Sequence, residues 1–167
     1  MEVDAKAYKD VLSRFASGVT VVTTLCDGVP HGLTVSAFAS VSAAPPRVLV
    51  CLSHSTDSMP LIDRSKRFAV HILGREHASL GPRFAKMVPG VEDPFEGLAH
   101  RAESTGSPIL EACLAWLDCE VVAQFAVGDH TVFVGAVKAA GHNPADGEPV
   151  LYFKRAWRVL GDGPLDV

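Results

Sequence analysis

A segment between residues 31 and 40, HGLTVSAFAS, carries small polar side chains along one face. Residues two apart share a face of a β-strand. The even positions of this segment are Gly32, Thr34, Ser36, Phe38 and Ser40. A face made largely of hydroxyls fills a core poorly. We therefore expect either a solvent-facing strand surface or a shallow polar surface on which a planar ligand can approach the backbone.

A second hydroxyl-rich segment, SHSTDS at residues 53–58, follows an apolar strand and precedes a short helix. Its hydroxyls and backbone N–H groups could hold a phosphate at the start of that helix. The competing interpretation is that Ser58 is an ordinary N-cap residue. The segment lacks the glycines and lysine of a P-loop, so position beside the first polar surface is its main functional signal.

The third feature is Gly128-Asp129-His130, which interrupts the apolar segment FAVGDHTVFVGAV at residues 125–137. Gly followed by Asp between two alternating strands is typical of a two-residue hairpin turn, with Gly at a positive φ. His130 is then the first residue after the turn, at the rim of a sheet. Its imidazole either reaches toward a bound ligand or is solvated without a role.

Other chemistries find little support in the spacing of the reactive residues. The histidines form no HxH or HExxH pair, and Cys26, Cys51, Cys113 and Cys119 form no CxxC pair. We expect reduced thiols in the core and no metal site. The sequence also lacks a GxSxG elbow and a GxGxxG loop.

The elements that would position these features are mostly short strands. Asp4 predicts the start of a helix that ends near Gly18 and packs Tyr8, Val11, Leu12 and Phe15 onto a sheet. Asp27-Gly28 predicts a hairpin between strands at 19–25 and 31–40. Further strands are expected at 48–52, 68–73, 114–127, 131–140 and 150–153, with a helix beginning near 59, mixed helix and loop over 75–97 and a loop over 141–149.

The composition and charge favour one compact domain and exclude several classes of partner. The 167 residues, 48% of them hydrophobic, predict one domain over 1–167. The net charge of -4 and the absence of a basic run argue against a nucleic-acid partner. The sequence shows no apolar stretch of membrane-spanning length and no signal-peptide pattern near its start, so we expect a cytoplasmic protein without a membrane partner.

Six segments in this order resemble the flavin reductase-like family, the short-chain NAD(P)H:flavin oxidoreductases of two-component flavin monooxygenases. The resemblance extends from about residue 8 to 160. The segments are FASGVTVVTT (15–24), HGLTVSAFASVSAAPPRVLVCLS (31–53), FAVHIL (68–73), RFAK (83–86), GDHTVFVGAV (128–137) and EPVLYFKRAWRVL (148–160).

The resemblance implies a fold, an assembly and a set of ligand contacts. The fold is a mainly β, FMN-binding split β-barrel of antiparallel, Greek-key type with a few peripheral helices. The chain would form a homodimer with the flavin in a groove near the subunit interface. The implied flavin contacts are Thr34, Val35, Ser36 and Ala37 for the ring, Cys51, Leu52, Ser53, Ser55 and Thr56 for ribityl and phosphate, and Phe84, Ala85 and Lys86 for the outer part.

His130 matches the family's histidine near the nicotinamide. Two positions depart from the family pattern, because relatives often carry Asn at Ser36 and Tyr at Trp157. The implied activity is hydride transfer from C4 of NADH or NADPH to N5 of FMN or FAD, with no catalytic side chain. The reduced flavin would pass to a transiently bound flavin-dependent monooxygenase. Alternatives are a non-catalytic FMN-binding electron carrier or redox sensor and a flavin-free interaction module.

Overall fold

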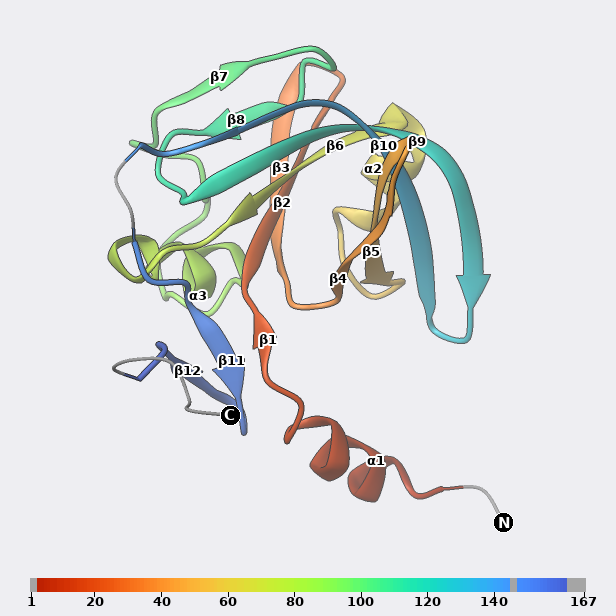
Figure 1. Ribbon diagram of the computed structural model, residues 1–167, viewed down its shortest axis with the longest axis vertical. Helices are drawn as coiled ribbons and strands as arrows, with labels where there is room; N and C mark the ends of the chain where they lie inside the picture. Colours follow the sequence, from red (N-terminus) through yellow and green to blue (C-terminus); the bar gives the residue numbers. More distant parts are fainter. Residues whose placement is uncertain (1–2, 145–146, 162–167) are drawn as a thin grey trace.

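The computed structural model describes residues 3–144 and 147–161. Its centre is a seven-stranded sheet in the order β3-β2-β6-β9-β10-β5-β4, in which every neighbouring pair is antiparallel. Figure 1 shows this sheet curling around a core. The strands are β2 Thr20–Cys26, β3 Val29–Val35, β4 Phe38–Ala43, β5 Pro46–Ser53, β6 Arg67–Ile72, β9 Ala115–Val127 and β10 His130–His142. The predicted antiparallel, mainly β architecture is confirmed.

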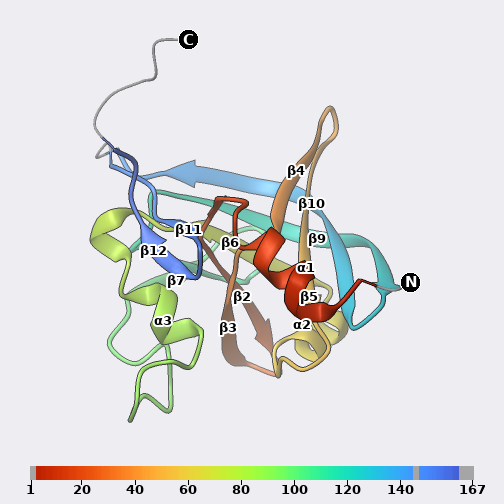
Figure 2. The same ribbon diagram turned by 90° about the horizontal axis from the view of Figure 1, so that it is seen from below.

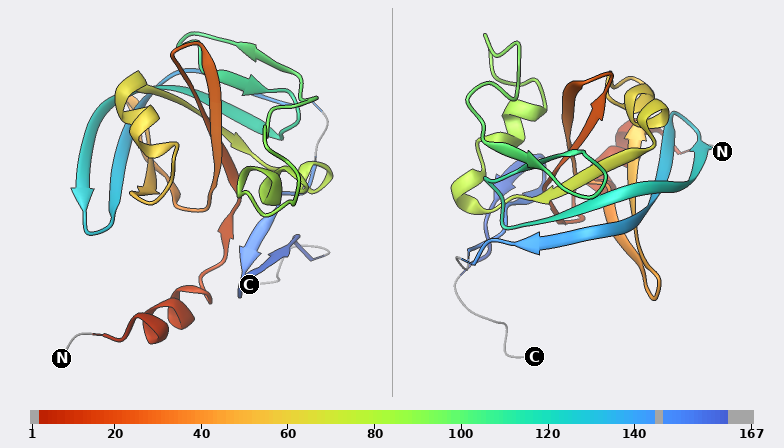
Figure 3. Two further views of the ribbon diagram at one scale, coloured as in Figure 1. Left: turned by 180° about the vertical axis from the view of Figure 1, so that it is seen from behind. Right: turned by 90° about the horizontal axis from the view of Figure 1, so that it is seen from above.

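Two small sheets and four short helical segments surround the central sheet. One small sheet joins β1 Ser17–Gly18, β11 Leu151–Phe153 and β12 Ala156–Arg158, and the other joins β7 His100–Ala102 and β8 Pro108–Leu110. The helices are α1 Ala5–Leu12, α2 Met59–Ser65 and α3 Leu80–Phe84, with a single 3-10 turn at Arg75–His77. Figure 3 shows α2 on one side of the curled sheet and α3 near the β11–β12 hairpin.

Both predicted two-residue turns are present. Asp27 and Gly28 have φ values of 52° and 78° between β2 and β3, as a primed hairpin turn requires. Gly128 has a φ of 59° between β9 and β10, and His130 is the first residue of β10. Turn chemistry in the sequence therefore located both hairpins correctly.

The predicted single strand over 31–40 is wrong, because the chain changes partner at Ser36-Ala37. β3 ends at Val35 and pairs with β2, whereas β4 begins at Phe38 and pairs with β5. The Cys51 N–H donates to the Ala37 carbonyl at 2.9 Å, which begins the new pairing. The break leaves β3 at one edge of the sheet and β4 at the other.

The long strand β9 is half-buried along only part of its length. From Ala115 to Glu120 it pairs with β6 on one side and β10 on the other, and Asp118 and Cys119 are fully buried. Beyond Glu120 the strand has β10 as its single partner. The predicted burial of Phe125 and Val127 is wrong, since their exposed fractions are 57% and 61%.

The first helix differs most from the prediction. Asp4 caps it as expected, with its carboxylate accepting the Ala7 N–H at 3.3 Å, but it ends at Leu12 rather than near Gly18. No residue of α1 is buried, and Phe15 beyond it is 74% exposed. Figures 1 and 2 show α1 projecting from the body beside the small β1-β11-β12 sheet. The expected packing of this helix on the central sheet is therefore wrong.

The segment over 75–97 is mixed helix and loop, as expected, and its helical part includes α3. α3 contains Gly81-Pro82 within its first turn, a position where proline is tolerated because its missing N–H would be unpaired anyway. The expected loop follows this helix from Lys86 onward. Part of the predicted loop over 141–149 lies outside the described residues. Within the described ranges, no helix is long and apolar enough to cross a membrane.

Candidate functional site

A groove runs along the edge strand β3 and consists of two connected hollows. Thr34 and Ala85 line both hollows, whose volumes are about 350 Å³ and 200 Å³. Together they fall in the size range of small-molecule sites. The larger hollow, here the hydroxyl end, is also lined by Gly32, Leu33, Ser55, Thr56, Asp57, Ser58, Phe84 and Lys86. The smaller one, the aromatic end, is also lined by Val19, Ser36, Met87, Tyr152, Arg155 and Trp157.

The loop that walls the hydroxyl end is held by hydrogen bonds among its own hydroxyls. The Ser53 and Ser55 hydroxyls lie 2.8 Å apart, and the Ser55 N–H donates to Ser53 Oγ at 3.2 Å. The Thr56 hydroxyl donates to the Ser53 carbonyl at 2.8 Å. These bonds keep several hydroxyls close together at the surface. An oxygen atom of a ligand could take the place of one of their present partners.

Ser58 stands at the N-cap position of α2, but its hydroxyl makes no capping bond. It points instead toward β3, where Ser58 Oγ lies 3.4 Å from the Gly32 carbonyl. The alternative that Ser58 is an ordinary cap is therefore wrong. Because Ser58 is 8% exposed, its role is to attach the loop to the edge strand.

An ion pair joins the two walls of the hydroxyl end. Lys86 Nζ donates to Asp57 Oδ2, and both side chains are more than 70% exposed. The hydrogen bond from Lys86, reinforced by its charge, holds the pKa of the Asp57 carboxyl below its usual value. Lys86 itself has a φ of 56° directly after α3, which turns the chain back toward the groove.

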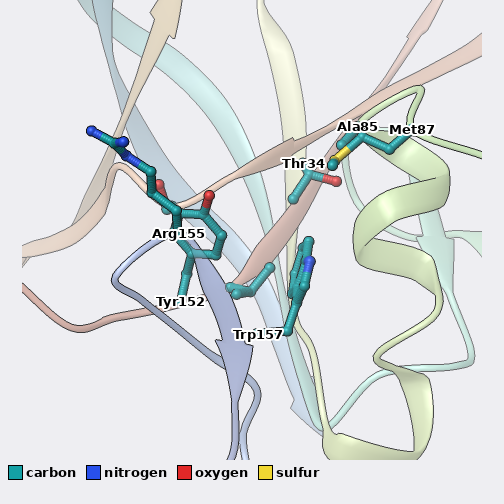
Figure 4. Close-up of a pocket in the computed structure, with 8 residues that line it drawn as sticks. Thr34, Ala85, Met87, Tyr152, Arg155 and Trp157 are labelled. Atoms are coloured by element: carbon teal, nitrogen blue, oxygen red, sulfur yellow. The ribbon is translucent and has the colours of Figure 1, made fainter. Parts of the chain in front are cut away.

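The aromatic end depends on a close contact between α3 and β12. A Cβ added at Gly81 would lie 2.4 Å from the Trp157 ring, so the indole rests on bare backbone at this point. Tyr152 meets Trp157 edge to face, with ring centroids 5.7 Å apart. Figure 4 shows the indole standing between the β11–β12 hairpin and α3, with Thr34 and Ala85 on the far side of the groove.

A hydrogen bond ties the edge strand to the same helix. The Thr34 hydroxyl donates to the Gly81 carbonyl at 2.6 Å. Because β3 has β2 as its single partner in the sheet, alternate backbone N–H and C=O groups of β3 face away from that ladder. The edge strand thus offers both hydrogen-bonding groups and a flat surface to a ligand in the groove.

The structure brings seven of the thirteen predicted site residues to the lining of this groove: Thr34, Ser36, Ser55, Thr56, Phe84, Ala85 and Lys86. Val35 and Leu52 are buried in the core, at 5% and 1% exposure, so only their backbone could face a ligand. Ala37 is exposed beside the groove, and the N–H of Cys51 is already bonded to its carbonyl. Burial and the nearby Asp129 raise the pKa of the Cys51 thiol.

His130 lies beside the start of the hydroxyl-rich loop, residues 53–58, rather than in the groove. It is opposite Ser53 in the β5–β10 ladder, and the next residue along, His54, donates its N–H to the Asp129 carbonyl at 2.9 Å. The His130 Nδ1 is 2.7 Å from Asp129 Oδ1, and the side chain is 41% exposed. Neither hollow of the groove is lined by His130.

Sequence reasoning missed several residues of the groove, above all Asp57, Tyr152, Arg155 and Trp157. The segment that contains the last three was noted as a motif, but no ligand contact was assigned to it. No local signal points to Trp157, because the glycine that it packs on, Gly81, lies far away in the sequence. Asp57 stood inside the hydroxyl loop, and its partner is 29 residues away in sequence.

The site as a whole is suited to a flat ring that carries an anionic tail. One end offers hydroxyls and a cation, the other offers aromatic and apolar side chains, and the edge of a sheet connects them. Such a groove on an antiparallel β-fold fits a planar, phosphorylated ligand in size and polarity. Among the described residues, no group of three His, Cys, Asp or Glu side chains is placed to hold a metal ion.

Comparison with known proteins identifies the family. The model of the flavin reductase-like domain matches residues 12–161, so the chain belongs to the flavin reductase-like family. It is 36% identical over 154 residues to the reductase subunit HsaB of a flavin-dependent monooxygenase from Mycobacterium tuberculosis, covering 92% of this chain and 81% of that protein. It is 37% identical over 158 residues to a flavin reductase (NADH) from Kitasatospora aureofaciens, covering 93% and 81%.

A solved structure supports the same conclusion. The flavin reductase PheA2 in its native state superposes with a TM-score of 0.87 at 32% identity, covering 96% of this chain and 100% of that one. The resemblance inferred from six sequence segments is therefore confirmed, and so is the split-barrel fold that it implied.

Proposed function

We propose that this protein is an NAD(P)H-dependent flavin reductase that supplies reduced flavin to a partner monooxygenase. The observation that carries the proposal is the groove, which joins an aromatic end to a hydroxyl end along an edge strand in a chain of this family. The relatives named above include a monooxygenase reductase subunit and an NADH-dependent flavin reductase.

The lining residues fit FMN. The hydroxyls of Ser55 and Thr56, with Lys86, line the hydroxyl end and would hold the phosphate through charge-assisted hydrogen bonds. Ser53 lines neither hollow but bonds Ser55, and its hydroxyl would join them at the phosphate. The backbone from Thr34 to Ala37 would bond the polar edge of the isoalloxazine ring, because the edge strand β3 ends at Val35 and Ser36-Ala37 continue from it between two strands. Trp157 and Ala85 would border the ring system, and Phe84 supports this wall from below at 2% exposure.

The protein's own contribution to the reaction is positioning. When bound, the nicotinamide and the flavin supply the hydride chemistry between themselves. The groove's residues would hold the flavin on one face and leave the other face open to a second planar ring. Holding two reactants in contact removes much of the entropic cost of their encounter. His130, beside the hydroxyl-rich loop, would contact the nicotinamide nucleotide from the rim.

The steady-state assay follows directly. Purified protein is mixed with each combination of FMN or FAD and NADH or NADPH, and loss of reduced nicotinamide is recorded. We expect continuous turnover with free flavin present in excess over protein, and one preferred pair. A protein that binds FMN but does not turn over NADH or NADPH would instead be an electron carrier, and one that binds neither flavin would be an interaction module.

We further propose that the active form is a homodimer. Two apolar surfaces of the chain are exposed: Tyr8, Val11 and Leu12 on the first helix with Phe15 just beyond it, and Phe125 and Val127 at the free end of β9. Figure 1 shows α1 at the lower right and the free end of the β9–β10 hairpin at the right, apart from each other. Exposed apolar surface of this extent is typical of an interface, and a second copy would cover both.

Sedimentation tests the assembly. At micromolar concentration we expect a dimer of the 167-residue chain. Phe125→Asp should shift the distribution toward monomer, because it places a charge in the proposed interface. As a matched control, Ala126→Asp places the same charge at the neighbouring exposed position, on the opposite face of β9. A monomeric parent protein would contradict the proposal.

A further inference from the structure

The ion pair between Asp57 and Lys86 spans the groove at its hydroxyl end. Asp57 belongs to the loop between β5 and α2, and Lys86 follows α3 on the opposite wall. Both side chains line the same hollow as Ser55 and Thr56. Of the described residues that line it, Lys86 is the single cation and Asp57 the single anion.

This ion pair adds little to the stability of the fold. The Lys86 and Asp57 side chains are 74% and 79% exposed, and ion pairs between exposed side chains contribute weakly because water and salt screen them. Its two members sit on separate loops, so each can take another partner without disturbing a strand. The pair is therefore a feature of the groove rather than of the core.

The pair changes the electrostatics that a phosphate would meet. Without Asp57, the lining would present one uncompensated positive charge beside a cluster of hydroxyls. With Asp57, Lys86 already has a partner, and a carboxylate stands where a second anion would arrive. The lowered pKa of Asp57 means that this carboxylate is charged at neutral pH and remains so in moderate acid.

We propose that Asp57 limits the affinity of the groove for phosphorylated flavin by holding Lys86 in an ion pair that the phosphate must displace. The inference rests on the proposed flavin reductase function and deepens it. A reductase that passes its reduced flavin to another enzyme needs a product that leaves. Asp57 is then the residue that keeps FMN exchangeable, and Lys86 is the side chain that changes partner when FMN enters and leaves.

The test compares two flavins that differ only in the phosphate. FMN and riboflavin are titrated into the parent protein and into Asp57→Asn, with flavin fluorescence as the readout. We expect the Kd for FMN to fall by about five- to tenfold in Asp57→Asn, since an opposing charge is removed from a partly screened site. The Kd for riboflavin should not change. The gain for FMN should shrink as salt is raised.

A second ion pair provides a matched control. Asp63 in α2 bonds Lys66, the residue directly after this helix, and neither residue lines the groove. Asp63→Asn removes the same charge from a similarly exposed pair, so it should leave both flavin affinities at the parent values. In a Lys86→Gln background, Asp57→Asn should gain much less for FMN, because the cation that it releases is gone.

The outcomes separate the inference from the function. A parent protein that binds neither flavin overturns the proposed function and this inference with it. A parent that binds FMN, with an unchanged FMN affinity in Asp57→Asn, overturns the inference alone. Equal tightening of FMN and riboflavin also overturns it, since the effect would then not involve the phosphate. Thermal melts of each variant confirm that folded proteins are being compared.

Discussion

The polar side chains in the interior of the sheet and those at the hydroxyl end of the groove are bonded in different ways. In the interior, His71 is fully buried, with Nδ1 2.9 Å from the Val21 carbonyl and Nε2 accepting the Leu110 N–H at 3.0 Å. Asp118 is also fully buried and accepts the Thr105 N–H at 2.7 Å. Each of these side chains joins neighbouring segments of the backbone.

In the groove, Thr34, Thr56 and Ser58 also bond backbone carbonyls, but two pairs at the hydroxyl end bond side chain to side chain. Ser53 bonds Ser55, and Asp57 bonds Lys86. Ser53 is half-buried and the other three are exposed. Their partners are side chains of the same kind as a ligand would offer. The difference shows which polar groups are structural: those that hold the backbone cannot change partner without unfolding a segment, whereas those that hold each other can.

This comparison can be broken by substitution, and Asp118→Ala should have the largest effect. It leaves the Thr105 N–H and hydroxyl without their carboxylate, and lost hydrogen bonds to a buried charged group cost about 1.5–3 kcal/mol each. We expect the free energy of unfolding in urea to fall by about 3 kcal/mol, with FMN affinity of the folded fraction unchanged. Glu120→Ala, two residues along at an exposed position, is the control and should change stability by less than about 1 kcal/mol.

The converse substitution in the groove is the double variant Ser53→Ala with Ser55→Ala. Each removes a hydroxyl that we assign to the phosphate, and charge-assisted bonds contribute about 1.5 kcal/mol or more each. We expect FMN to bind tens to about a hundredfold more weakly, riboflavin to bind as before, and the melting temperature to stay near that of the parent. An unchanged FMN affinity would place the phosphate elsewhere.

A pH series sharpens the comparison without a substitution in the groove. Burial lowers the pKa of His71 from 6.5 to about 4, whereas the unfolded chain binds this proton near pH 6.5. Between pH 6.5 and 4 the unfolded state therefore holds more protons, and stability falls as pH falls. By pH 5 the loss from this residue is about 2 kcal/mol.

Urea unfolding of the parent and of His71→Gln at several pH values measures this loss. Glutamine can donate and accept at this position but does not titrate, so the variant should lose less stability than the parent between pH 7 and 5. Identical pH slopes for the two proteins would show that His71 is not the group responsible.

How far the sequence predicts these regions depends on whether a signal is local. Both hairpin turns were located because Asp27-Gly28 and Gly128-Asp129 specify their geometry within two residues. The break at Ser36-Ala37 was missed, because it contains no glycine or proline and the new pairing depends on a bond from Cys51 on another strand. The first helix was misplaced because the spacing of apolar residues identifies an apolar face but not what covers it.

The candidate site shows the same limit. The hydroxyl loop could be recognised from six consecutive residues, 53–58. The ion pair of Asp57 with Lys86 and the contact of Trp157 with Gly81 join segments 29 and 76 residues apart, and only the fold brings them together. The family resemblance supplied positions, but not the pairing that gives each position its chemistry.

The smallest expected effects come from the turn between β9 and β10, at Gly128 and His130, which lies outside both regions. His130 is bonded through its side chain to the adjacent Asp129 and lies at the rim, so His130→Ala should leave stability and flavin affinity within about 0.5 kcal/mol of the parent. As a lost positioning contact, it should lower kcat/KM for NADH by a few-fold, corresponding to about 1 kcal/mol.

Gly128→Val should do the opposite, because a β-branched residue at a φ of 59° is strained even though open space surrounds the site. Its melting temperature should fall while kcat/KM of the folded protein is retained. Stopped-flow reduction of flavin by NADH, with melts of both variants, measures the pair. If His130→Ala reduces flavin at the parent rate at every NADH concentration, His130 is a solvated turn residue without a role in the reaction.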